Sequence, residues 1–190
     1  MTAKEFEKLK PYQKRVAIAK DILEQIKAKR YIARAGSYIE SAKLPGGGET
    51  PIKKNFNKIK ECHVCQIGAI ILSTTKFRNK LIKDDVGGGL HTITNNVYEI
   101  LKDIFSPKQL LLIEEAYESP YCTGDRYAYK IDEKIGLDWD EEDACQDFYD
   151  QFLPENYDDL DEDKNTAMAD EDRMIAIMRN IIKHRGTFKP

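Results

Sequence analysis

Apolar residues recur with helical spacing in several separate stretches of the chain. Thr2 and Glu5 have the spacing of a capping box, which predicts a short helix at once. Pro11 either ends this helix or begins the next one. Residues 12–30 are predicted to be helical because one face carries an apolar stripe, made of Val16, Ala19, Ile22, Leu23 and Ile26.

The strongest helical pattern lies further along, at 170–186. Asp170, Glu171 and Asp172 place negative charge where a helix dipole favours it, and Gly186 follows a basic last turn as a C′ residue would. The apolar face of this helix consists of Met174, Ile177, Met178 and Ile181, widened by Ile175 and Ile182. A face this wide needs cover, so we expect it to lie in the core or, alternatively, at an interface between copies.

Local signals define the middle of the chain less completely. Ser106, Pro107 and Gln109 predict a helix start, with Ser106 as N-cap and Gln109 closing a capping box. The apolar run at 65–72 is buried in any fold, but its pattern does not distinguish helix from strand. A small strand pair fits either 31–41 or 118–135. The predicted fold is therefore a mainly α, single-domain helical bundle over residues 1–190, with at most a minor β hairpin.

Length and composition agree with one domain that stays in the compartment where it is made. The chain has 190 residues, of which 41% are hydrophobic and 33% charged. The longest apolar stretch, 67–72, is far shorter than a membrane span, and the first residues contain no apolar signal core. We therefore expect a cytoplasmic protein, with no membrane contact and with cysteines in the thiol form.

Charge is distributed unevenly along the sequence. Residues 1–60 hold 15 Lys or Arg against 6 Asp or Glu, whereas residues 138–190 hold 6 against 16. The acidic excess is concentrated in an insert at about 138–163, where aromatic residues interrupt the charges. The two ends could attract each other within one chain or between copies, or they could form separately solvated faces.

Only weak candidates for metal or cofactor chemistry are present. Cys62 and Cys65 have the two-residue spacing that zinc sites use, but Cys122, Cys145 and His91 do not supply a second close pair. Structural cysteines are the favoured interpretation, and no cofactor is expected. The glycine triplets at 46–48 and 87–89 do not fit a phosphate loop, since neither is followed by the required lysine.

Two binding functions suggested by charge are also weak. The acidic stretch from Asp159 to Asp170 lacks the glycine that a calcium loop needs at its sixth position, which is Lys164. A solvated acidic loop is the better interpretation. The lysines of the N-terminal third alternate with apolar residues, as on an ordinary solvated helix face, so nucleic acid is not an expected partner.

Two stretches resemble a family of small proteins found in phages and bacteria. The first is the C-x-x-G-A-I segment at 65–70, and the second combines 105–118 with Arg173–Ile182 and the segment 186–188. The resemblance covers about half of the chain. It implies a helical domain and a bacteriophage or prophage source, and it implies no reaction, cofactor or catalytic residue.

These observations together predict a non-enzymatic, phage-encoded binding protein in the cytoplasm of an infected bacterium. It would sequester or block a host factor or a small signalling ligand, either as a homo-oligomer or bound to a host or phage protein. Two alternatives stay open. One is a structural or packaged protein of the virion. The other is a small hydrolase or nucleotide-acting enzyme whose site is assembled from dispersed carboxylates with Arg126 or His91.

Overall fold

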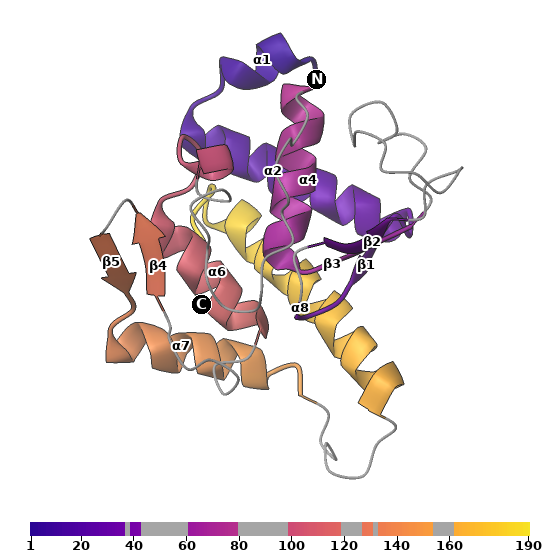
Figure 1. Cartoon of the computed structure of the whole chain (residues 1–190), viewed down its shortest axis with the longest axis vertical. Coiled ribbons are helices and arrows are strands. Elements are labelled where there is room, and N and C mark those ends of the chain that lie inside the picture. The colour runs from indigo at the N-terminus through magenta and orange to yellow at the C-terminus, as the bar shows by residue number, and fades with distance from the viewer. Residues whose placement is uncertain (37–38, 43–60, 80–98, 119–126, 131–132, 154–161) are drawn as a thin grey trace.

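The described part of the computed structural model is mainly helical and carries two small sheets, which confirms the predicted fold class (Figure 1). The residues described are 1–36, 39–42, 61–79, 99–118, 127–130, 133–153 and 162–190. The minor hairpin is formed by β4 (Tyr127–Lys130) and β5 (Glu133–Gly136), which pair antiparallel. No helix among these residues has the length and apolar character that crossing a membrane requires.

The first two helices begin where the sequence signals place them. Helix α1 (Ala3–Glu7) has the capping box between Thr2 and Glu5, and α2 (Pro11–Lys27) begins at its proline. The predicted apolar stripe of α2 was partly wrong. Ile18, which was not in it, is buried with Ala19, Ile22 and Ile26, whereas Val16 and Leu23 are only half-buried. Residues 18, 22 and 26 follow each other at intervals of four, and this row of α2 faces the core. The apolar residues beside the row lie nearer the surface.

Three short strands form a mixed sheet at one edge of the helices. The order is β1 (Tyr31–Ala33), β3 (Cys62–Val64) and β2 (Ile39–Ala42), with β1 parallel and β2 antiparallel to the central β3. Extended structure was predicted for 31–41, but β3 was not. A strand of three residues is too short to show a period.

Helix α4 (Gln66–Arg78) follows β3 directly and runs through the middle of the molecule (Figure 1). Every residue from Gln66 to Thr75 is buried, and α4 contacts α1, α2 and α6. A helix covered on all sides is apolar on all sides, so it has no amphipathic period to read. This explains why the pattern at 65–72 did not separate helix from strand.

Helix α6 (Pro107–Glu118) begins as predicted, with the Ser106 hydroxyl accepting a hydrogen bond from the backbone N–H of Gln109 at 3.2 Å. The second half of the predicted capping box was wrong. The Gln109 side chain instead exchanges two hydrogen bonds with the backbone of Phe188, accepting from its N–H at 2.8 Å and donating to its carbonyl oxygen at 3.3 Å. The start of α6 is thereby joined to the C-terminal segment.

The acidic part of the chain contributes two helices. Helix α7 (Trp139–Asp150) has a capping box between Asp138 and Glu141 and packs on α6, burying Cys145 and Phe148. Helix α8 (Glu162–Lys183) packs on α2. The predicted start of α8 at Asp170 was wrong, because the helix begins eight residues earlier and Asp170 lies buried inside it.

Helix α8 ends in a Schellman motif, and the prediction that Gly186 is its C′ residue was wrong. Arg185, with φ +54°, takes the C′ position, and Gly186 is the residue after it. Gly186 has φ +95°, and its N–H donates to the Ile181 carbonyl oxygen at 2.7 Å. A Cβ at this position would overlap the Tyr12 carbonyl oxygen, so the turn after α8 fits closely against the start of α2. The Arg15 guanidinium donates to the Gly186 carbonyl oxygen in the same region.

Candidate functional site

Of the weak metal candidates, Cys62 is the first residue of the central strand β3 and Cys65 is the N-cap of α4. Both thiols are buried, and burial raises the pKa of Cys62 to about 12 and that of Cys65 well above its usual range. Within the described ranges, no three His, Cys, Asp or Glu side chains are grouped to hold a metal ion. Cys145 is buried elsewhere, on the inner face of α7, and Cys122, His91 and Arg126 lie outside the described residues.

The apolar face predicted for the last helix lies inward in this structure. Met174, Ile177 and Met178 are completely buried, and Ile181 is 1% exposed. They belong to a cluster of buried hydrophobic residues that extends from Phe6 to Phe188. Within one chain these side chains are therefore core residues and are not available to a second copy.

A buried polar cluster lies where α4, α6, α8 and the end of β1 meet. We call it the Asp170 cluster, and it comprises Cys65, Tyr117, Glu118, Asp170 and Arg173. Its two carboxylates hold the backbone that leaves β1: the Ala35 N–H donates to Asp170 Oδ2 at 2.9 Å, and the Gly36 N–H donates to Glu118 Oε2 at 2.7 Å. Residues distant in sequence thus fix the exit of the strand.

Arg173 is the cation of this cluster and is 2% exposed. Its Nη2 donates to Asp170 Oδ1 and its Nη1 donates to the Tyr117 carbonyl oxygen, both at 2.8 Å. The guanidinium also lies 3.9 Å from the centroid of the Tyr149 ring. Among the described residues, Arg173 Nε and the Tyr117 hydroxyl have no hydrogen-bond partner, which is a cost to stability.

Burial controls the protonation of the two carboxyls. Desolvation raises the pKa of Glu118 from 4.5 to about 7, although the Gly36 N–H and the Cys65 thiol hydrogen-bond to it. Desolvation also raises the pKa of Asp170, against the Ala35 hydrogen bond and the charge of Arg173. A carboxyl that titrates near neutrality can exchange a proton, but both carboxyls here already hold backbone amides. The arrangement is that of a structural cluster.

The raised pKa of Glu118 predicts an unusual pH dependence. Between about pH 4.5 and 7 the folded chain keeps the proton that the unfolded chain has lost, so stability should fall as pH rises through this window. The full effect is at most about 3 kcal/mol. Glu118→Gln keeps an acceptor for the Gly36 amide and should remove most of this fall.

Urea unfolding of both proteins at pH 5 and pH 8 measures this difference. Asp147→Asn, a change at an exposed position of α7, serves as the control and should leave the fall unchanged. Equal pH dependence of the wild type and Glu118→Gln would contradict the buried, protonated carboxyl.

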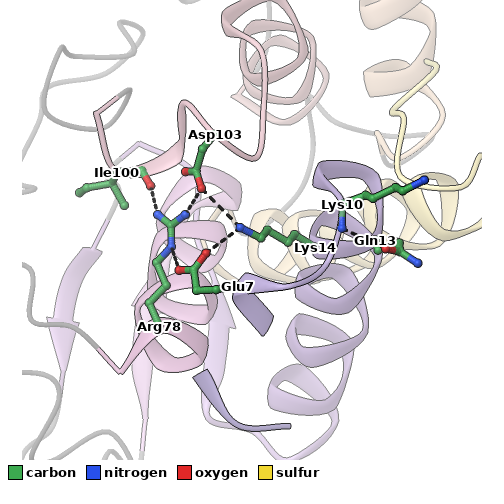
Figure 2. Close-up of polar contacts among 7 residues, drawn as sticks. All are labelled: Glu7, Lys10, Gln13, Lys14, Arg78, Ile100 and Asp103. Atoms are coloured by element: carbon green, nitrogen blue, oxygen red, sulfur yellow. Dashed lines mark hydrogen bonds and ion pairs between the residues drawn. The ribbon is translucent and has the colours of Figure 1, made fainter. Parts of the chain in front are cut away.

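A second polar network joins the N-terminal helices to the turn before α6. Figure 2 shows Lys14 and Arg78 between the carboxylates of Glu7 and Asp103. Lys14 Nζ lies 2.7 Å from Glu7 Oε2, and the Arg78 Nη1 donates to the Ile100 carbonyl oxygen at 2.8 Å. The hydrogen bond from Lys14 lowers the pKa of Glu7. With two cations matched to two anions, the network connects elements and does not offer an unpaired charge to a ligand.

A further feature is an open groove between α2 and the end of α8. We call it the α2–α8 groove; its volume is about 520 Å³. Its apolar lining comprises Leu9, Tyr12, Val16, Ala17 and Ile182. Gln13 also lines it, as do two cations, Lys20 and Arg185, while no carboxylate among the described residues does. Tyr12 is 43% exposed, and no described segment covers it.

The groove was not predicted from the sequence, although one signal for it was present. Tyr12, Val16 and Lys20 follow each other at intervals of four and so share one face of α2. Val16 was assigned to the core stripe because an apolar residue at helical spacing is usually buried. Comparison with protein-family models, with curated proteins and with solved structures finds no match.

Proposed function

We propose that this is a non-enzymatic binding protein that holds another polypeptide in the α2–α8 groove. The observation that carries the proposal is the groove itself, in which five apolar side chains, from α2, the segment before it and α8, are partly or fully exposed. Apolar surface of this kind, rimmed by charge, is typical of a site for protein contact. Its two cations favour a partner segment that bears carboxylates beside an apolar anchor.

The position of the groove supports a rigid, preformed surface. It is built on α2 and on the end of α8, which pack on each other, and the contacts of Gly186 with Arg15 and Tyr12 hold the turn after α8 against α2. A surface that is already ordered loses little conformational freedom when a partner binds. The Asp170 cluster and the Figure 2 network, by contrast, have their charges committed to internal partners.

The resemblance to phage proteins suggests where this binding takes place. We propose that the protein sequesters or blocks a host factor in the cytoplasm of an infected bacterium. Occlusion of a binding segment by the groove would be sufficient for such an effect, and it needs no reaction.

Native mass spectrometry of the protein purified from a bacterial host tests the proposal. Val16→Glu places a carboxylate on the groove floor at a half-buried position, whereas Lys27→Glu changes a charge on an exposed part of α2 outside the groove. We expect a stoichiometric polypeptide partner with the wild type and with Lys27→Glu, and its loss with Val16→Glu. A bare single chain in every case, or a partner that Val16→Glu retains, would contradict the proposal.

A further inference from the structure

Two exposed aromatic residues stand out in the described part of the chain. Of the large hydrophobic residues there, Met1, Tyr12 and Trp139 are exposed, and Trp139 is 79% exposed. Tyr12 lines the α2–α8 groove, whereas Trp139 is the first residue of α7. One aromatic therefore belongs to an apolar hollow, and the other projects from the surface of a different helix.

Trp139 is surrounded by negative charge. The turn from Asp138 to Asp143 contains five carboxylates, of which Asp138 and Glu141 form the cap of α7 and pair with Lys108. Asp140 and Asp143 are exposed and make no ion pair with another described residue. Asp143 is four residues after Trp139, so both side chains lie on the same face of α7. We call residues 138–143 the Trp139 turn.

The groove has the complementary character. Lys20 and Arg185 contribute cations beside an apolar floor, and its volume of about 520 Å³ is sufficient for an indole ring. Tryptophan buries about 150–250 Å² and is among the residues that contribute most to protein interfaces. An apolar ring flanked by carboxylates thus matches an apolar hollow flanked by cations.

We propose that the Trp139 turn of one copy docks in the α2–α8 groove of a second copy. This inference rests on the proposed function and names the partner of the same groove. A second copy is the occupant that the charges indicate, because one chain carries both halves of the contact. Two reciprocal contacts give a closed dimer, and the exposed Trp139 is then covered.

Sedimentation equilibrium over a roughly hundredfold range of protein concentration tests the contact. We expect the wild type to dimerise and Trp139→Ala to raise the dissociation constant about 30-fold or more, as loss of a central anchor does. Val16→Glu should act similarly from the other side. Because Trp139 is 79% exposed in one chain, its removal should leave the melting temperature of the monomer unchanged.

Mixing the two variants gives a sharper result. Trp139→Ala keeps an intact groove and Val16→Glu keeps an intact Trp139 turn, so an equimolar mixture should form heterodimers through one contact while each variant alone is monomeric. Lys20→Glu should weaken dimerisation. The double variant Lys20→Glu with Asp143→Lys exchanges the two charges and should regain part of the affinity. The exposed Lys27→Glu is the control and should dimerise normally.

A wild type that stays monomeric at every concentration would overturn the inference, as would a dimer that neither Trp139→Ala nor Val16→Glu weakens. Either result leaves the groove available to a different polypeptide, which the native mass experiment detects independently. If that experiment also shows no effect of Val16→Glu, the proposed function fails as well.

Discussion

Replacing Arg173 with methionine is expected to lower the free energy of unfolding by about 3–5 kcal/mol. The guanidinium is almost completely buried and contacts the Asp170 carboxylate, the Tyr117 carbonyl oxygen and the Tyr149 ring. Methionine fills much of the space but leaves the buried Asp170 without its hydrogen-bonded cation. Urea unfolding of the purified variant at pH 8 measures the loss.

Two comparisons show whether the loss comes from the uncompensated charge. At pH 5 the loss should be smaller, because Asp170 without Arg173 can take up a proton. Adding Asp170→Asn removes the stranded charge, so the double variant should lose less than the sum of the two single changes. A loss below about 1 kcal/mol that is equal at both pH values would contradict the role assigned to Arg173.

Replacing Ile177 with aspartate is expected to abolish folding. Ile177 is completely buried on the face of α8 that also carries Met174, Met178 and Ile181. An aspartate there would have to be buried without a cation, at a cost comparable to the whole stability of a domain. Circular dichroism should show loss of helix, and the same outcome is expected for Met178→Asp.

Arg179→Asp is the matched control, because Arg179 is exposed on the same helix and receives the same new side chain. It should fold with a melting temperature close to that of the wild type. Ile177→Val should also fold, with a loss of about 0.5–1.5 kcal/mol. A folded Ile177→Asp protein with normal stability would show that this face of α8 is not in the core.

The sequence predicted the features that neighbouring residues determine. Thr2 and Glu5 cap α1, Pro11 begins α2, and Ser106 caps α6, each through contacts within three or four residues. Such contacts depend only on the local order of residue types, so one chain is sufficient to recognise them.

Features that depend on distant residues were not predictable in this way. Gln109 does not close its capping box because Phe188, 79 residues later, offers two backbone partners. Asp170 fits the start of a helix by local charge, yet it lies inside α8, where its carboxylate accepts from the distant Ala35 amide. In both cases a tertiary partner replaced the local one.

The candidate site has the same origin. Periodicity shows that α2 is apolar on a broad arc, but it does not show which part of that arc the other helices cover. Ile18, Ile22 and Ile26 are buried in the core. Tyr12 and Val16 lie beside them and line the groove. The second wall of the groove, Ile182 and Arg185, lies more than 160 residues later.

The close fit of Gly186 against Tyr12 has a consequence for folding during synthesis on the ribosome. Helix α2 is translated well before α8, on which it packs, and α8 is the last of the described elements. Until α8 is made, the apolar row at 18, 22 and 26 lacks part of its cover, so we expect a nascent chain in this state to be prone to aggregation. Contacts between the two ends also raise the contact order, which predicts slow folding for a mainly helical protein.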